Sequence, residues 1–301
     1  MIEVTEKQNC CGCTACVAVC PKNCIEMKED MEGFLYPEVD QSSCIHCNAC
    51  DRVCPILNVK ERKPFEQSAY IVQNKDVEVL RESTAGGAFT AIAKYVIHNS
   101  GVVFGVELNK NLEAHHIYVE DVTELKRFRN SKYVQSSVGG TLRKVKFFLE
   151  QGKTVCFSGT PCQIEGLKCY LKKDYENLIT VDVVCRAVPS PLIFRKYVEL
   201  QKQELEDDIK TVRFRDKYYG YKYSTMNVVT DRNHGNYHQG VESDPWLRAF
   251  FSNICDRPSC HNCHFRNQYR VSDFTIWDCF HAGRFSSGLC DRRRQQPRRC
   301  G

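Results

Sequence analysis

The sequence contains no apolar run of the ~18–20 residues that a membrane-spanning helix requires. Its N-terminus, MIEVTEKQNC, has neither the basic start nor the apolar stretch of a secretory signal peptide. We therefore expect a cytoplasmic protein without a membrane span. Thiols stay reduced in that compartment, so clustered cysteines predict metal ligands rather than disulfides.

Excess positive charge is scarce outside one end of the chain. The formal net charge is +5, but residues 285–301 contribute +4, from five arginines and one aspartate. This segment has almost no apolar residue and no periodicity, so we expect an unstructured tail. A basic surface for nucleic acid would depend on this tail alone, and we predict no nucleic-acid partner.

Cysteine is abundant: the chain has 20, and ten of them lie within the first 54 residues. Those ten include two copies of the motif C-x2-C-x2-C-x3-C-P. In two-cluster ferredoxins, the first three cysteines of one copy and the last cysteine of the other hold one 4Fe-4S cluster. The spacing therefore predicts one cluster on Cys10, Cys13, Cys16 and Cys54, and a second on Cys44, Cys47, Cys50 and Cys20.

Two cysteines of this region, Cys11 and Cys24, are surplus and are expected to pack nearby. A pair of zinc knuckles is disfavoured, because zinc sites close with their own local ligands. Residues 9–55 resemble the bacterial two-cluster ferredoxin domain, which implies a small α+β unit that relays electrons. We assign residues 1–58 to this domain and the charged segment 59–68 to a linker.

Residues 69–284 alternate between strand-like and helix-like segments, which predicts an α/β domain with a mainly parallel sheet. The expected strands cover 69–74, 102–108, 115–120, 154–159 and 178–185, and the expected helices 88–99, 138–151, 160–173 and 191–205. Asp121 and Glu124 resemble a capping box. After residue 206 the pattern is strand-rich, and the tyrosine-rich stretch 216–224 is expected to be a strand.

Two cysteines are expected at one edge of this sheet. Cys162 begins a predicted helix directly after a strand, and Cys185 ends the next strand. The carboxyl ends of parallel strands meet at one edge, where ligands bind in open α/β sheets. With the C-x2-C pair Cys260 and Cys263, these thiols could hold a third 4Fe-4S cluster, and Cys255 is the alternative for one of them. A redox-active thiol at Cys162, with a pKa lowered by the helix start, is the non-cluster alternative.

A Ser/Thr/Gly-rich turn precedes the helix expected at 88–99. Ser83, Thr84, Gly86 and Gly87 leave backbone amides unshielded at the helix start, which suits a pyrophosphate or the edge of a flavin. An ordinary N-cap with a glycine turn is the alternative. Lys132 could face an anionic flavin ring or a phosphate, or it could be a solvated surface lysine.

Six separated segments, in order, resemble the beta subunit of coenzyme F-420 hydrogenases and dehydrogenases. They are ESTAGGAFTAI (82–92), SKYVQS (131–136), FSGTPCQIEGLKCYL (157–171), VDVVCRAVPSP (181–191), SCHNCHFRN (259–267) and SDFTIWD (272–278). The resemblance implies bound FAD, a cluster on Cys162, Cys185, Cys260 and Cys263, and electron passage to a soluble carrier, typically the deazaflavin coenzyme. It also favours flavin binding at the 83–87 turn and Lys132.

The sequence departs from that family at two places. Arg186-Ala187 stands where members usually have His-Gly, and folded sequence usually continues beyond the last segment. We therefore expect the flavin domain, 69–284, to be truncated, with the tail arising from a shifted reading frame or a sequencing artefact.

The predicted function is an iron–sulfur flavoprotein oxidoreductase. Electrons would pass from a ferredoxin-type donor through 4Fe-4S clusters to FAD, and on to an acceptor such as coenzyme F-420. The alternatives are a non-catalytic electron-transfer subunit of a larger redox complex and a thiol-dependent reductase.

Overall fold

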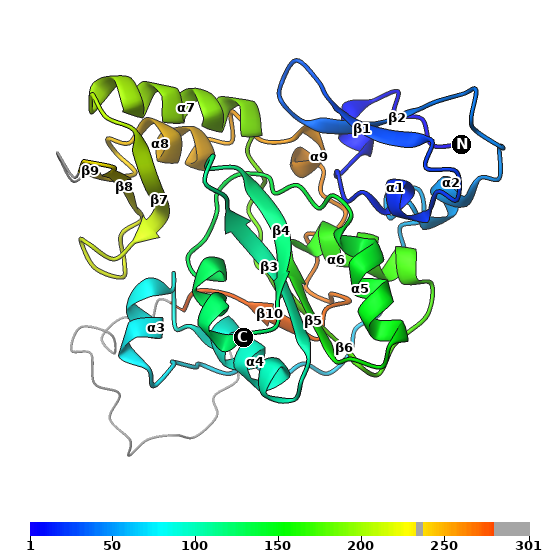
Figure 1. Cartoon of the computed structure of the whole chain (residues 1–301), viewed down its shortest axis with the longest axis horizontal. Coiled ribbons are helices and arrows are strands. Elements are labelled where there is room, and N and C mark those ends of the chain that lie inside the picture. Colours follow the sequence, from blue (N-terminus) through cyan, green and yellow to red (C-terminus); the bar gives the residue numbers. More distant parts are fainter. Residues whose placement is uncertain (233–236, 280–301) are drawn as a thin grey trace.

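The computed structural model describes residues 1–232 and 237–279, which form three sheets with surrounding helices (Figure 1). The helices are η1 (Lys7–Asn9), α1 (Ala15–Val19), α2 (Ala49–Val53), α3 (Val77–Glu82), α4 (Ala88–His98), η2 (Val122–Phe128), α5 (Thr141–Glu150), α6 (Pro161–Leu171), α7 (Pro191–Glu204), α8 (Pro245–Phe251) and α9 (Pro258–His261). The strands are β1 (Ile25–Glu29), β2 (Leu35–Val39), β3 (Val102–Leu108), β4 (Ala114–Val119), β5 (Val155–Gly159), β6 (Leu178–Val183), β7 (Ile209–Asp216), β8 (Thr225–Thr230), β9 (Tyr237–Gly240) and β10 (Phe274–Ile276).

The two copies of the cysteine motif fold alike in the N-terminal module. Each leads into a short helix, α1 or α2, whose N-cap residue is left-handed: Thr14 has φ 62° and Asn48 has φ 55°. The last cysteine of each copy, Cys20 or Cys54, is the C-cap of that helix. Between the copies, β1 and β2 form an antiparallel hairpin. This is the small α+β unit that the sequence predicts.

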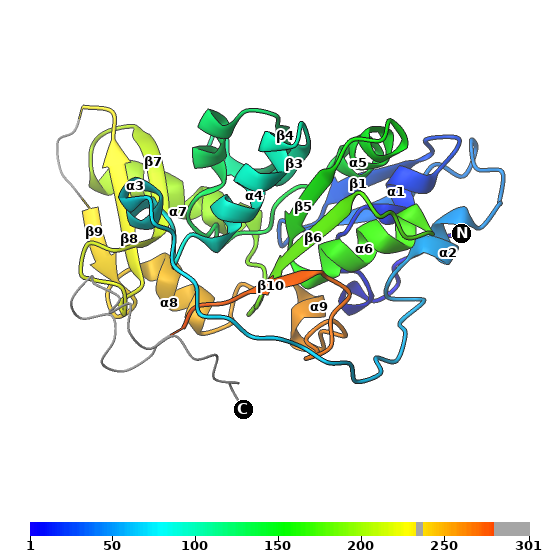
Figure 2. The same cartoon turned by 90° about the horizontal axis from the view of Figure 1, so that it is seen from below.

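The central sheet has the strand order β10-β6-β5-β3-β4. All neighbours are parallel except β3 and β4, so the prediction of a mainly parallel sheet is confirmed. Helix α4 covers one face and helices α5 and α6 cover the other (Figure 2). Successive side chains of a strand point to opposite faces of the sheet: Val103 packs with Val96 of α4, whereas Phe104 packs with Ile164 of α6.

A third sheet forms a separate layer with α7 and α8, at the left of Figure 1. Strands β7, β8 and β9 are antiparallel, and Phe194, Phe214 and Trp246 fill the core between this sheet and the two helices. Asp244 caps α8 by accepting a hydrogen bond from the Leu247 amide at 2.7 Å. The strand-rich pattern expected after residue 206 is therefore confirmed.

The N-terminal module shares its core with the α/β domain. Ala15, Ala18 and Val53 of the module lie in one apolar cluster with residues of α5 and α6, beside which the module stands in Figure 1. A glycine permits a close approach between them: a Cβ on Gly166 of α6 would lie 2.6 Å from the Cys13 Cβ and 2.8 Å from its Sγ.

Two predicted strands are wrong. Residues 69–74 form no strand, since the exposed Tyr70, Ile71 and Val72 face solvent and no strand in the described ranges pairs with the segment. Residues 216–224 contain the turn between β7 and β8, where Gly220 has φ +98°. Apolar and aromatic side chains favour a strand only where another backbone supplies the hydrogen bonds.

The remaining elements lie within a few residues of their expected positions. Asp121 caps η2 through the Thr123 amide, but Glu124 pairs with Arg127 instead of closing a capping box. Residues 59–68 form no helix or strand. The tail predicted at 285–301 lies outside the described residues, and within them no helix is long and apolar enough to cross a membrane.

Candidate redox site

The second predicted cysteine set lines one cavity. A hollow of about 340 Å³, a volume that includes space open to solvent, is lined by Cys20, Cys44, Cys47, Cys50 and the surplus Cys24. Apolar side chains complete the lining, among them Ile25, Ile45 and Val39. The Ile2 amide also donates to the Cys50 Sγ at 3.2 Å. Thiols in an apolar hollow, with an amide N–H on one sulfur, fit a 4Fe-4S cluster.

The first predicted set also converges. Burial and the neighbouring thiols Cys10 and Cys54 raise the pKa of Cys16 to about 12. Burial raises the pKa of Cys54 as well, against the opposing backbone amides of Leu57 and Ile56. Amides directed at these sulfurs favour thiolates once a cluster neutralises part of their charge, so this set also fits a cluster.

The third set comes together from three places in the fold. Cys162 begins α6 after β5, and Cys185 follows the neighbouring strand β6. Burial, and then the thiols of Cys162, Cys260 and Cys263, raise the pKa of Cys185 well above its usual value. Burial, and then the Asp256 carboxylate, raise the pKa of Cys255 to about 11, and no other cysteine contributes to this shift.

The sequence-based expectation of a lowered pKa at Cys162 is wrong. A hydrogen bond with Cys11 and then burial raise the pKa of Cys162 well above its ordinary value, and Thr160 Oγ1 lies 3.1 Å from the sulfur. Cys11 therefore packs nearby as expected, between Cys13 and Cys162. Cys162 thus lacks the lowered thiol pKa on which the alternative of a thiol-dependent reductase rests.

None of the cysteines that the structure describes forms a disulfide. Cys156 is fully buried in the core beneath α4, whereas Cys169 and Cys279 are partly buried. Cys290 and Cys300 lie outside the described residues. Within residues 1–232 and 237–279, no group of three or more His, Cys, Asp or Glu side chains could hold a single metal ion. A 4Fe-4S cluster instead binds each thiolate to a different iron.

The glycine turn 83–87 is joined to the segment that carries Lys132. Ser83 is buried, and Thr84 Oγ1 accepts a hydrogen bond from the Ser131 amide at 2.7 Å. Gly87 is the N-cap of α4 with φ +75°, a conformation that favours glycine. A Cβ on Gly86 would lie 2.3 Å from the Val72 carbonyl oxygen, so chain packing requires this glycine.

Lys132 is not a freely solvated lysine. Its Nζ donates to the carbonyl oxygens of Arg127 at 3.1 Å and Arg129 at 2.9 Å. Burial lowers the pKa of Lys132 to about 7, and the Arg213 guanidinium adds to the effect. The amine can therefore gain or lose its proton near neutral pH.

Two further cations border the turn, and sequence reasoning missed both. Arg213 of β7 donates to the Glu82 carbonyl at 3.0 Å, and Lys217 donates to the Leu80 and Ala85 carbonyls at 2.6 and 3.0 Å. No local pattern marks these residues, because they follow the turn by about 130 positions in the sequence. They bring two basic groups to the turn, of which Arg213 is also ion-paired with Asp216 at 2.9 Å.

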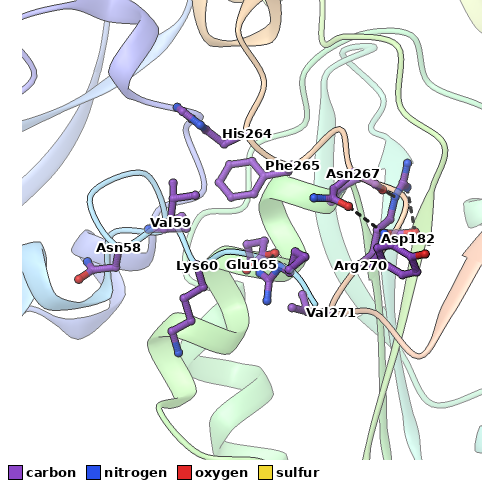
Figure 3. A pocket seen from close by; sticks show the side chains of 14 residues that line it. Asn58, Val59, Lys60, Glu165, Asp182, His264, Phe265, Asn267, Arg270 and Val271 are labelled. Atoms are coloured by element: carbon purple, nitrogen blue, oxygen red, sulfur yellow. Dashed lines mark hydrogen bonds and ion pairs between the residues drawn. The ribbon is translucent and has the colours of Figure 1, made fainter. Parts of the chain in front are cut away.

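A second cavity, of about 390 Å³ counted out to open solvent, lies where the module, the linker and α6 meet (Figure 3). Two of its lining residues are paired: Asp182, near the end of β6, accepts a hydrogen bond from Arg270 Nη1 at 3.2 Å. Glu165 of α6 is paired with Arg62 of the linker. No sequence pattern indicates this cavity, because it joins segments that lie far apart in the chain.

Comparisons with known proteins match both parts of the chain. Residues 9–57 match the family model of the 4Fe-4S dicluster domain. Residues 152–293 match the model for the C terminus of the coenzyme F420 hydrogenase/dehydrogenase beta subunit. In this chain, a segment similar to a 4Fe-4S dicluster domain is thus followed by one similar to the C terminus of these beta subunits. Both predicted resemblances are confirmed, and the protein is an iron–sulfur electron-transfer protein related to these beta subunits.

One similar solved structure is described as "Xenon derivatization of the F420-reducing [NiFe] hydrogenase complex from Methanosarcina barkeri". The two chains are 18% identical with a TM-score of 0.46. The similarity covers 65% of this chain and 66% of the other, just under two thirds of its length. The comparison with curated proteins gives no match.

Proposed function

We propose that this protein is an oxidoreductase that passes electrons from a ferredoxin-type donor through three 4Fe-4S clusters to FAD, and on to a soluble acceptor such as coenzyme F-420. Two clusters would occupy the cysteine sets of the dicluster domain. The third would occupy Cys162, Cys185, Cys260 and Cys263. Clusters carry single electrons, and a bound flavin combines them into a two-electron or hydride transfer.

The position of α6 between the first and third cysteine sets carries the proposal. Cys13 of the first set packs against Gly166 of this helix, and Cys162 of the third set begins it. Cys11 bridges the two, because its thiol interacts with those of both Cys13 and Cys162. The protein's part in electron transfer would be to hold donor and acceptor groups close together, and this arrangement supports that role.

The surrounding residues would set the reduction potentials of the clusters by excluding water and by hydrogen bonding to the sulfurs. Apolar side chains line the second hollow, and amides of the module are directed at sulfurs of both dicluster sets. Solvent exposure and hydrogen bonds to sulfur are two of the factors that set the potential of a cluster.

Flavin binding is proposed for the 83–87 turn, at the start of the eleven-residue helix α4. Lys132, Arg213 and Lys217 place three basic side chains around this turn, and basic groups beside backbone amides suit a pyrophosphate. The near-neutral pKa of Lys132 would let its amine donate a proton or a hydrogen bond to an anionic ring. Ser83, Thr84, Gly86 and Gly87 would supply the backbone approach.

A second candidate function is a relay subunit without its own flavin, in a larger redox complex. It is favoured by the contacts within the turn. The Val72 carbonyl occupies the space beside the Gly86 Cα, and Lys132 and Lys217 donate hydrogen bonds to backbone carbonyls. These groups would have to exchange partners to receive a flavin.

Iron and flavin content after anaerobic purification and cluster reconstitution distinguishes the two functions. About twelve irons and one FAD per chain are expected for the oxidoreductase, and about eight to twelve irons without flavin for the relay. Iron near zero in a folded protein would refute both.

A further inference from the structure

A buried arginine connects the α/β domain to the first cysteine set. Arg257, the residue before α9, has no exposed surface. Its Nε donates to the Cys10 carbonyl at 2.7 Å, and its Nη2 lies 3.5 Å from the Cys10 Sγ. Nη1 donates to Gln135 Oε1 at 3.1 Å, and Nη2 donates to the Leu35 carbonyl at 3.0 Å. The guanidinium is therefore held in one orientation, against a predicted cluster ligand.

The module is shaped around this side chain. The guanidinium carbon lies 4.3 Å from the ring centroid of Tyr36 and 5.4 Å from that of Phe34. Gly12, in the first cysteine motif, has φ +72°, and a Cβ there would lie 3.1 Å from Arg257 Nη1. Ring faces enclose the cation, and a glycine makes room for it.

No carboxylate of the described residues forms an ion pair with Arg257, whereas many other arginines have such a partner. An unpaired charge in a protein interior is costly, so a buried cation is expected to have a nearby negative group. Four thiolates outweigh the charge of an iron–sulfur core, and each added electron increases the negative charge. A cluster on Cys10 would supply the missing counter-charge.

We propose that Arg257 is the counter-charge of the first cluster and raises its reduction potential. The proposal depends on the assignment of Cys10, Cys13, Cys16 and Cys54 as ligands. In the step concerned, one electron leaves the donor and enters the cluster, and no proton is required. A fixed positive charge beside Cys10 stabilises the more negative, reduced cluster. Arg257 would thus act through its charge and make the first cluster a better electron acceptor than it would be without this arginine.

The test is a potentiometric titration of the reconstituted full chain, followed by electron paramagnetic resonance, for the wild type, Arg257→Gln, Arg257→Lys and Arg143→Gln. Arg143 is the matched control, because it also holds the module but donates only to the carbonyls of Ala18, Val17 and Cys20. For Arg257→Gln we expect the ratio of reduced to oxidised cluster to fall at least tenfold at fixed potential, which is about 59 mV for one electron. Arg257→Lys keeps the charge and should stay within about threefold of the wild type.

The sign of the shift separates charge from mere packing. Loosened packing admits water, which stabilises the reduced cluster and raises the potential, whereas loss of the cation lowers it. A raised or unchanged potential in Arg257→Gln would refute the proposal, as would an equal fall in Arg143→Gln. If Arg257→Gln retains no iron, the Arg257→Lys variant decides. A tenfold fall in its ratio of reduced to oxidised cluster would refute the charge effect, because lysine keeps the positive charge. Wild-type protein without N-terminal clusters would instead refute the ligand assignment.

Discussion

The contact between Gly166 and Cys13 gives a sharp prediction about the first cluster. In Gly166→Ala, the new Cβ would lie 2.6 Å from the Cys13 Cβ and 2.8 Å from its Sγ, closer than carbon and sulfur atoms can pack. Cys13 is buried in the core shared by the module and α6, so it cannot move freely. The module must therefore shift away from the helix.

Two effects on stability oppose one another in this variant. Overpacking costs about 1–3 kcal/mol, whereas alanine is better than glycine inside a helix by about 1 kcal/mol. The difference gives a net loss of about 0–2 kcal/mol in the free energy of unfolding. The effect on the cluster should be larger, because a displaced Cys13 removes one of four ligands. The variant should lose about four irons per chain.

The assay is iron content after reconstitution, combined with urea unfolding of the apo protein. Gly140→Ala is the control, since a Cβ at Gly140 has nothing within 4 Å. It should retain its iron, although alanine at this N-cap costs up to about 1 kcal/mol. Unchanged iron in a folded Gly166→Ala protein would refute the packing argument and the assignment of Cys13 as a ligand.

Four other substitutions test three separate parts of the structure. Cys260→Ala should lower the iron content by about four per chain and Cys255→Ala should not, and the reverse result would exchange the two ligands. Asp244→Ala should cost about 2–5 kcal/mol in urea unfolding, because it removes the α8 cap and the acceptor of the Tyr197 and Tyr237 hydroxyls, both at 2.8 Å; a loss under about 1 kcal/mol would contradict this. Lys132→Met should be more stable than the wild type, and the difference should be largest below pH 7, where the buried amine of the wild type must be protonated. This difference in stability should shrink as the pH rises from 7 toward 10. A pH-independent difference would show that Lys132 does not titrate as proposed.

Local sequence patterns were enough to predict much of the fold. The alternation of apolar segments placed β3, β5 and β6 and the helices between them, because periodicity records which side chains must be buried. It failed at residues 69–74, since strand formation depends on a partner backbone that lies elsewhere in the chain. The turn at 216–224 was missed because its tyrosines resemble strand residues, while Gly220 directs the reversal.

The candidate site divides in the same way. The spacing within each cysteine motif predicted both dicluster sets, because the ligands of a ferredoxin cluster come mostly from one short loop. Strand order suggested that Cys162 and Cys185 would be neighbours. The neighbours that raise the pKa of Cys162, and the cations Arg213 and Lys217 beside the glycine turn, have no local pattern.

The sequence by itself determined the two kinds of domain and the cysteines that can serve as ligands, because short-range spacing dictates both. Only the tertiary structure placed Arg257 against Cys10 and Gly166 against Cys13. Both contacts join residues that lie far apart in the sequence and on different domains, and they form only when the module packs on α6. Electrostatic and packing energies depend on such distances in space, which the order of residues does not encode locally.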